Sequence, residues 1–290
     1  MTRTLVLRKS SLGDVVLAGA VTGGLGAVVF QTQARWHGVA VRLPGVVEVR
    51  PWHAPVADVD QIIDLQGSPA SRWMSLSSGL PVRRLARAHL ARRLRPVLKT
   101  PPAAPVVQRY AAAARTTVAP HPWIPIPRVP DPEHLVLAPG AAWATKRWPA
   151  SQWTLLGQRW AGPVTVLGGP GDVDLCAAIA SGIGPRARAL CEQGFDQTFD
   201  TLSTAATVVA GDTGLLHLAA ACGVPVVGIY GPTTSMDGFW CHPGVVVELD
   251  LLPCRPCSRH GTPTCPSGDH LCMTGLPVNA VFDAIVGRSR

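Results

Sequence analysis

One polar turn near the start of the chain, Lys9-Ser10-Ser11-Leu12-Gly13-Asp14, carries a carboxylate that could take part in catalysis. It follows the apolar stretch 4–7, which predicts a short strand, and it leads into a predicted helix over 14–25. At a helix start, Asp14 can simply cap free backbone N–H groups. It can also accept a proton from a substrate hydroxyl. Such turns lie at the carboxyl ends of parallel strands, where ligands bind, so the position favours the catalytic interpretation.

Two turns in the second half of the chain could bind a nucleotide. In the segment 138–149, Thr145 and Lys146 could hold phosphate oxygens by hydrogen bond and charge. This segment does not match the Walker P-loop, which has a glycine directly before the lysine. The turn 168–172 is rich in glycine and ends in Asp172. Asp172 could cap a helix or hydrogen-bond a ribose, and both interpretations stay open.

The most specific turn is Asp212-Thr213-Gly214, which follows the apolar strand predicted over 207–210 and opens a helix. The free backbone N–H groups of a helix start suit a diphosphate, and Thr213 adds a hydroxyl. His217 lies one helical turn further on, within reach of the same phosphates. The alternative is a capping turn followed by a buried, hydrogen-bonded histidine.

The elements that must position these turns alternate between strand and helix. Strands are predicted at 4–7, 28–31, 46–50, 62–65 and 82–85, and again at 135–138, 164–167, 207–210 and 226–229. Helices are predicted at 14–25, 106–114, 150–160, 174–181, 198–205, 214–221 and 278–286. This alternation favours parallel sheets joined by right-handed crossovers.

Five prolines between residues 119 and 130 predict an extended linker, because proline is excluded from helix interiors and central strands. We therefore expect two α/β domains that face each other across a cleft. The first spans 1–125, the second spans 126–276 and includes a cysteine-rich loop at 254–273, and a C-terminal helix covers 277–290.

The charge distribution points to an anionic partner for the first domain. Residues 1–130 contain 17 basic and 5 acidic side chains, whereas residues 131–290 contain 9 and 13. A dense basic run consists of Arg83, Arg84, Arg87, Arg92, Arg93, Arg95 and Lys99. The run lacks the aromatic residues on which nucleic-acid bases stack, so phosphorylated lipid is the favoured anion and nucleic acid is not expected.

All eight cysteines lie in the second half of the chain, and four of them cluster late. These four are Cys254, Cys257, Cys265 and Cys272. The spacing is compatible with a structural four-thiolate site for zinc or an iron–sulfur cluster, which would have no part in the chemistry. The alternative is a set of reduced thiols packed in a loop, since disulfides are rare in a reducing cytosol.

Taken in order, these motifs resemble glycosyltransferase family 9, which includes the ADP-heptose:lipopolysaccharide heptosyltransferases. The resemblance rests on Ser-Ser-Leu-Gly-Asp at 10–14, Asp-Leu-Gln-Gly at 64–67, Thr-Lys-Arg-Trp-Pro at 145–149, Asp-Thr-Gly-Leu-Leu-His at 212–217, and Tyr-Gly-Pro-Thr at 230–233. Each motif alone is weak, and their joint order is the strong signal. The chain departs from the family in being short, with the acceptor domain trimmed between residues 25 and 64.

The resemblance implies an α/β fold of GT-B type, with two Rossmann-like domains and an inverting transfer that needs no cofactor. Asp14 would be the general base. The donor nucleotide sugar would be held by Thr145, Lys146, Asp172, Asp212, Thr213, Gly214 and His217. The acceptor would be held by Ser11, Arg72, Arg83 and Arg84.

The predicted function is transfer of a heptose or hexose from a nucleotide diphosphate sugar, with ADP-heptose as the expected donor, to a lipopolysaccharide core-type acceptor. Three alternatives stay open: a UDP- or GDP-hexose transferase, a non-catalytic sugar-nucleotide-binding protein, and a basic nucleic-acid-binding protein. The start of the chain does not resemble a signal peptide, and no apolar stretch reaches the length of a membrane span. We therefore expect a cytoplasmic protein, with a peripheral position at the inner membrane where its lipid-linked acceptor would lie.

Overall fold

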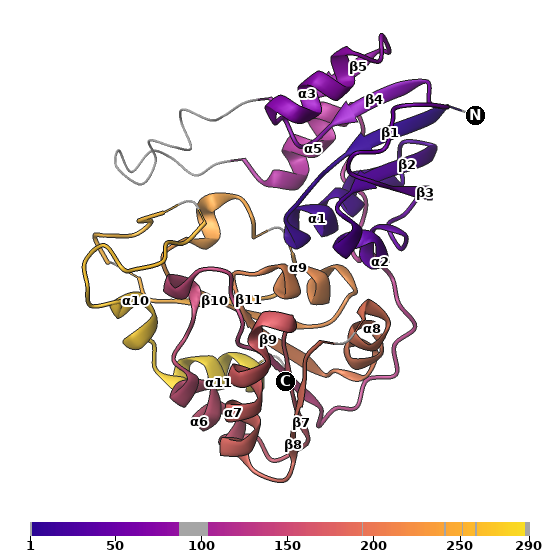
Figure 1. Ribbon diagram of the computed structural model, residues 1–290. Coiled ribbons are helices and arrows are strands. Elements are labelled where there is room, and N and C mark those ends of the chain that lie inside the picture. The colour runs from indigo at the N-terminus through magenta and orange to yellow at the C-terminus, as the bar shows by residue number, and fades with distance from the viewer. Residues whose placement is uncertain are drawn as a thin grey trace.

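The computed structural model describes residues 2–86, 104–192, 194–240, 242–250, 252–258 and 260–287. The part of the predicted basic run that begins at Arg87 lies outside the described residues. The chain forms an N-terminal and a C-terminal lobe, each built on a parallel sheet with helices packed against it (Figure 1). Among the described residues, no helix combines the length and apolar character needed to cross a bilayer.

The sheet of the N-terminal lobe has the strand order β3-β2-β1-β4-β5. Its strands are β1 (Arg3–Leu7), β2 (Ala27–Thr32), β3 (Val46–Pro51), β4 (Gln61–Asp64) and β5 (Val82–Arg84). Its helices are α1 (Leu12–Thr22), α2 (His37–Ala40), α3 (Pro69–Leu76) and α5 (Val106–Ala114). The strand order reverses between β1 and β4, which opens a crevice at the carboxyl ends of these strands. The turn that carries Asp14 follows β1 and therefore lies at this crevice.

The sheet of the C-terminal lobe has the order β11-β10-β9-β6-β7-β8. Its strands are β6 (Leu135–Ala138), β7 (Val164–Leu167), β8 (Ala187–Leu190), β9 (Thr207–Gly211), β10 (Val226–Tyr230) and β11 (Val245–Glu248). Its helices are α6 (Ala150–Arg159), α7 (Val173–Ile183), α8 (Phe195–Thr204), α9 (Gly214–Ala221), α10 (Leu271–Thr274) and α11 (Val278–Val286). Here the order reverses between β9 and β6, so the turns after these two strands meet at one edge of the sheet.

The predicted strands and the long helices are present, but the sequence patterns missed the strands at both edges of the second sheet. The central strands β6, β7, β9 and β10 are buried along their whole length, and apolar runs of this kind are typical of parallel strands covered on both faces. Strand β8 has the sequence Ala-Arg-Ala-Leu and is half-exposed, so its sequence contains no apolar run that would predict a strand.

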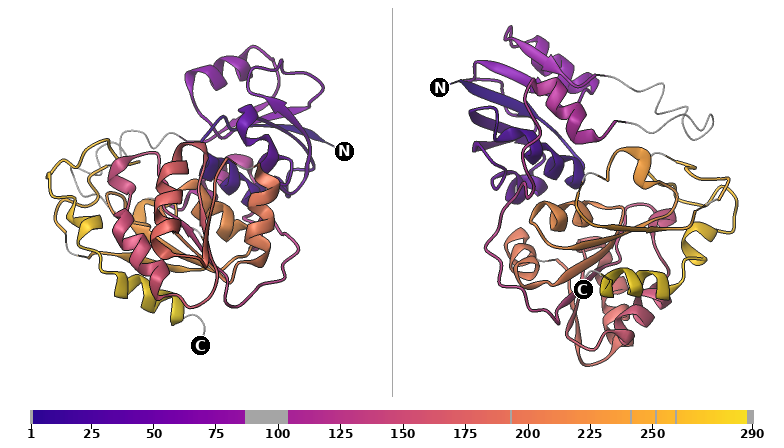
Figure 2. Two further views of the ribbon diagram at one scale, coloured as in Figure 1. Left: turned by 60° about the horizontal axis from the view of Figure 1, so that its bottom comes forward. Right: turned by 180° about the vertical axis from the view of Figure 1, so that it is seen from behind.

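The two lobes are packed together rather than joined by a free spacer. Trp123 and Ile124 of the proline-rich linker are buried, and the N–H of Ile124 donates to the carbonyl oxygen of Ala221 at the end of α9. Helices α1 and α9 lie against each other between the two sheets (Figure 2). A side chain at Gly13 would come within 2.8 Å of the ring of His217, so this close approach of the two helices requires glycine.

Candidate active site

A cavity of about 530 Å³ lies between the lobes, and both contribute to its wall. The N-terminal lobe supplies residues from the turn after β1, from the ends of β4 and β5, and from α5. The C-terminal lobe supplies the turns after β6 and β9 and part of the late cysteine-rich loop. The lining includes Arg8, Ser11, Asp14, Gln66, Gly67, Arg109, Tyr110, Trp143, Lys146, Asp212, Thr213, Gly214, Phe239 and His260. The turns that the sequence singled out after β1 and β9 therefore face one space.

Asp14 lies at the N-terminal end of α1 and has four hydrogen-bond or ion-pair contacts. The backbone N–H and hydroxyl of Ser11 donate to its Oδ2 at 3.2 and 3.1 Å. The Nη2 atom of Arg8 lies 2.5 Å from the same oxygen, and the hydroxyl of Tyr110 donates to Oδ1 at 3.1 Å. Capping and acceptance of a substrate proton were the two interpretations of this residue. The structure shows the capping contacts and places the carboxylate in the cavity lining, and the catalytic role stays a prediction.

These contacts set the protonation state of Asp14. Burial raises the pKa of the carboxyl, but the Arg8 guanidinium and the two Ser11 donors outweigh it and hold the pKa below its ordinary value. Burial and the neighbouring Asp14 carboxylate raise the pKa of Tyr110, which keeps its phenol neutral and able to donate. Asp14 is therefore an ionised acceptor at neutral pH.

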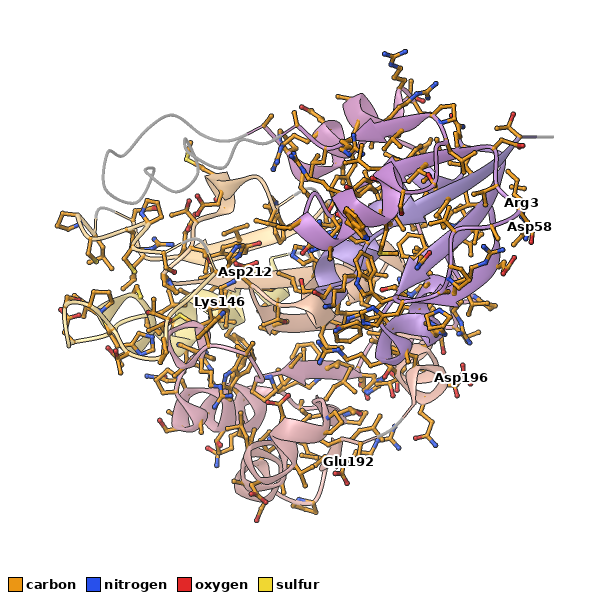
Figure 3. All side chains as sticks on the ribbon, turned by 45° about the horizontal axis from the view of Figure 1, so that its top comes forward. Arg3, Asp58, Lys146, Glu192, Asp196 and Asp212 are labelled. Carbon is orange, nitrogen blue, oxygen red and sulfur yellow. The ribbon has the colours of Figure 1, made fainter. Side chains whose placement is uncertain are left out.

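On the opposite wall, Lys146 and Asp212 form a tight ion pair (Figure 3). The Nζ atom of Lys146 lies 2.5 Å from Oδ2 of Asp212 and donates to the Asp212 carbonyl oxygen at 3.0 Å. Thr233 donates its hydroxyl to the same carboxylate at 2.7 Å. Burial raises the pKa of Asp212, but Lys146 and His217 lower it far more. The ionised Asp212 carboxylate thus fixes the Lys146 ammonium at the cavity wall.

The N-terminus of α9 contributes donors beside this ammonium. Thr213 is the N-cap residue, yet its side chain makes no capping hydrogen bond. Its hydroxyl oxygen is buried and has no partner within the part of the chain that the structure describes. Both Thr213 and Gly214 line the cavity. A hydroxyl, free backbone N–H groups and an ammonium in one place match the donor set that binds a phosphate.

His217 lies behind this site and does not line the cavity. Its Nε2 atom is 3.8 Å from Oδ1 of Asp212, and its Nδ1 atom is 2.8 Å from Nε2 of His242. Burial, followed by the neighbouring histidines, lowers the pKa of His242, which therefore stays neutral. His217 supports Asp212, a role close to the buried, hydrogen-bonded histidine of the structural alternative.

Two other predicted donor residues are also placed away from the cavity lining. The Thr145 hydroxyl donates to the carbonyl oxygen of Thr262 at 2.9 Å and accepts from its N–H at 2.8 Å, which ties the late loop to the turn after β6. The Asp172 carboxylate accepts from the N–H of Gly169 at 3.0 Å, as a capping residue does. Their roles in donor binding remain predictions.

Of the predicted acceptor residues, only Ser11 lines the cavity. Arg83 donates to the carbonyl oxygen of Ala114 at 3.1 Å, and Arg84 donates to the hydroxyl of Ser75 at 2.7 Å. Arg72 lies on α3, outside the lining.

Within the described part of this lobe, the cations that line the cavity are Arg8 and Arg109, which the sequence patterns did not indicate. Arg8 directly precedes the turn that holds Asp14, and this position was the available signal. Arg109 and Tyr110 reach the cavity from α5, and no local pattern marks them.

The predicted four-thiolate metal site is not assembled. Among the described residues, no group of three or more histidine, cysteine or acidic side chains is arranged to hold a metal ion, and all four cysteines belong to that set. Cys254 is exposed, Cys272 is a buried residue of α10, and the Cys265 thiol lies 3.2 Å from the hydroxyl of Ser267. The loop is held by hydrogen bonds, including those of Arg255 to carbonyl oxygens that follow β10.

Comparison with known proteins gives matches along the whole chain. Residues 127–259 match the sequence profile of "Glycosyltransferase family 9 (heptosyltransferase)". The chain is 28% identical to lipopolysaccharide heptosyltransferase 1 of Pseudomonas aeruginosa, over 89% of this chain and 86% of that protein.

Two solved structures share the fold. E. coli ADP-heptose lipopolysaccharide heptosyltransferase II has a TM-score of 0.74 at 18% identity, over 100% of both chains. E. coli heptosyltransferase WaaC with ADP has a TM-score of 0.68 at 20% identity, over 99% of this chain and 98% of that one. The predicted GT-B type fold, with two parallel sheets, is confirmed.

Proposed function

We propose that the chain is a member of glycosyltransferase family 9 and that it transfers a heptose from ADP-heptose to a lipopolysaccharide core-type acceptor with inversion at the anomeric carbon. The observation that carries the proposal is the shared cavity. It sets an ionised carboxylate of one lobe, Asp14, across from the ammonium and helix N-terminus of the other. A displacement between two bound sugars needs a proton acceptor on one side and a site for a leaving diphosphate on the other.

The names of the relatives support this donor and this acceptor. The Pseudomonas relative is a lipopolysaccharide heptosyltransferase, and the E. coli structures are described with ADP or as ADP-heptose enzymes. The unpartnered hydroxyl of Thr213 and the ammonium of Lys146 fit the diphosphate that these names imply.

In the proposed reaction, Asp14 accepts the proton of the acceptor hydroxyl while that oxygen bonds to the anomeric carbon. The bond between this carbon and the diphosphate oxygen breaks, and ADP leaves with the electron pair. Lys146 and the first N–H groups of α9 stabilise the charge that grows on the diphosphate. Arg8 keeps Asp14 ionised, and Tyr110 holds its second oxygen. Asp212 orients Lys146, with His217 behind it.

We also propose that the reaction needs no cofactor. Lys146 and the N-terminus of α9 would themselves stabilise the charge of the leaving diphosphate. The proposal also includes an anionic, lipid-linked saccharide as the acceptor. Arg8 and Arg109 bring positive charge to the N-terminal part of the cavity, and the sequence has no acidic residue between Leu65 and Pro130. We infer a position at the inner membrane face, and nucleic acid has no role in this function.

The test measures heptose transfer from ADP-heptose to a deacylated core saccharide, together with thermal stabilisation by ADP, UDP and GDP. Wild type is compared with Lys146→Met and with the control Arg188→Met, which removes an exposed cation at the far edge of the same sheet. ADP at about 100 times its Kd stabilises the folded state by about 2.7 kcal/mol. We expect this stabilisation in wild type and Arg188→Met, and its loss in Lys146→Met. Equal stabilisation of all three proteins, or none by any nucleotide, would contradict the donor site.

A further inference from the structure

Helix α3 (Pro69–Leu76) packs Met74 against the core, but it also turns two serines inward and two large apolar side chains outward. Its inward face carries Ser71 and Ser75, which are fully buried. Its outward face carries Trp73 and Leu76, which are 75% and 68% exposed. The spacing of three residues places Trp73 and Leu76 on the same side of the helix. A surface helix of a globular protein normally turns its apolar stripe inward.

Hydrogen bonds hold the helix in this orientation. The Ser71 hydroxyl donates to Oδ2 of the buried Asp64 at 3.0 Å, and Arg84 donates to the Ser75 hydroxyl at 2.7 Å. Rotating α3 to bury Trp73 would leave the Asp64 carboxylate without one of its donors inside the lobe. The exposure of the two apolar side chains is therefore built into the fold.

The charge around this face selects an anionic partner. Arg72 lies on α3 itself, and Arg84 of β5 reaches the Ser75 hydroxyl of the same helix. The sequence from Leu65 to Pro130 contains no acidic residue that would repel an anion. Exposed tryptophan and leucine flanked by arginine are typical of side chains that enter the headgroup region of an anionic bilayer.

The face also lies beside the acceptor part of the cavity. Gln66 and Gly67 line the cavity, and α3 begins two residues later at Pro69. Leu85, directly after β5, lines it as well. In Figures 1 and 2, α3 and β5 lie at the end of the N-terminal lobe that points away from the C-terminal sheet. A bilayer against α3 would therefore lie at the far end of the N-terminal lobe, with the cavity residues Gln66 and Gly67 at the start of the same helix.

We propose that Trp73 and Leu76 insert into the interfacial region of an anionic bilayer and hold the acceptor side of the cavity against the membrane. This inference rests on the proposed function, since a lipid-linked acceptor is what gives the contact its purpose. A second copy of the chain and an apolar protein partner are the other possible occupants of the face, and the experiment separates them.

The experiment measures the binding of the full chain to vesicles by sedimentation. One vesicle set contains phosphatidylethanolamine and phosphatidylglycerol in a 7:3 ratio, and the other contains neutral phosphatidylcholine. The test variant is Trp73→Ser/Leu76→Ser. The matched control is Val41→Ser/Val47→Ser, which removes two exposed apolar side chains near the opposite edge of the same sheet, 57% and 64% exposed.

We expect wild type and the valine control to bind the anionic vesicles, and the Trp73/Leu76 variant to partition about tenfold more weakly or worse. Neutral vesicles should bind all three proteins weakly. Transfer to a soluble core saccharide should stay within about twofold of wild type in both variants, whereas transfer to vesicle-embedded acceptor should fall in the Trp73/Leu76 variant alone.

Equal binding of wild type and the Trp73/Leu76 variant to the anionic vesicles overturns the proposal. So does a wild-type dimer, seen by analytical ultracentrifugation without lipid, that this variant converts to a monomer, because a second copy would then cover the face. Absence of vesicle binding by wild type also overturns it and favours a protein partner. Thermal stabilisation by ADP is measured without lipid. A result that contradicts the proposed donor site is therefore distinguished from one that contradicts the proposed membrane contact.

Discussion

The substitution Asp14→Asn tests the chemistry most directly, because it keeps the shape of the side chain and removes its charge. An amide cannot accept the proton of the acceptor hydroxyl. Removal of a positioned general base typically lowers the rate by about 10²–10⁴, which is roughly 3–5 kcal/mol in the activation barrier. We expect kcat to fall by this factor while ADP still stabilises the protein, since Lys146 and the α9 N-terminus lie on the other wall.

The same substitution also costs stability, which the assay must allow for. The pair between Arg8 and Asp14 is largely buried, with 11% and 16% of the side chains exposed. Breaking such a pair by removing one charge costs roughly 3 kcal/mol, partly offset here because Arg8 also donates to the carbonyl oxygen of Leu65 at 2.6 Å. We expect the melting temperature to fall by roughly 6–12 °C, so rates are measured at a temperature at which circular dichroism shows a folded variant.

The pH dependence gives an independent check on Asp14. Its pKa in the folded protein lies below the ordinary carboxyl value of about 4, so the pair with Arg8 contributes stability that is complete above that value. This contribution is lost as the pH falls through the folded pKa. The acid limb of kcat should therefore lie below the ordinary carboxyl range, and the stability difference between wild type and Asp14→Asn should shrink in acid.

The matched control is Asp60→Asn, an exposed aspartate of the same lobe whose carboxylate accepts from the backbone N–H of Arg3 at 2.7 Å. We expect this variant to keep the wild-type kcat. The assignment of Asp14 as the base is refuted if Asp14→Asn keeps more than about a tenth of the wild-type kcat at a temperature where it is folded.

Two further predictions concern the packing of the lobes and the absence of a cofactor. Gly13→Ala places a methyl group 2.8 Å from the His217 ring, so thermal unfolding should show a loss of about 1–3 kcal/mol, whereas Gly171→Ala, whose added methyl group meets nothing within 4 Å, should be near neutral. An unchanged melting temperature for Gly13→Ala would mean that the helices do not approach as described. Dialysis against EDTA should leave kcat unchanged, and a loss restored by one added metal ion would disprove the cofactor-free reaction.

The sequence predicted some of the cavity residues correctly and misplaced others. The turns after β1 and β9 were identified because catalysis and phosphate binding require particular residue types at strand ends. Asp14, Lys146, Thr213 and Gly214 all reach the cavity from such turns. Thr145, from the same turn as Lys146, is used instead to hold the late loop, and two hydrogen bonds to Thr262 that no local pattern encodes determine this.

The sequence by itself determined the fold class, because buried parallel strands and the helices between them have apolar periodicities that are local. It also determined the order of the loops at the sheet edge, and with it four cavity residues of the C-terminal lobe, namely Lys146, Asp212, Thr213 and Gly214. Edge strand β8 was not predicted, because a half-exposed strand needs no apolar run in its sequence.

Only the tertiary structure decided which cations serve the cavity and which side chains stay exposed. Arg8 and Arg109 come from different elements and both reach the cavity only when α5 packs against α1, β4 and β5. The charge pattern favoured Arg83 and Arg84 as acceptor-binding residues. In the structure they donate hydrogen bonds to the carbonyl oxygen of Ala114 and the hydroxyl of Ser75, which lie on other elements of the fold. The outward face of α3 was decided in the same way, because the buried carboxylate of Asp64 takes the Ser71 side of the helix as its partner. Hydrogen bonds between residues of different elements cannot be predicted from local sequence patterns, because the two partners come together only in the folded protein.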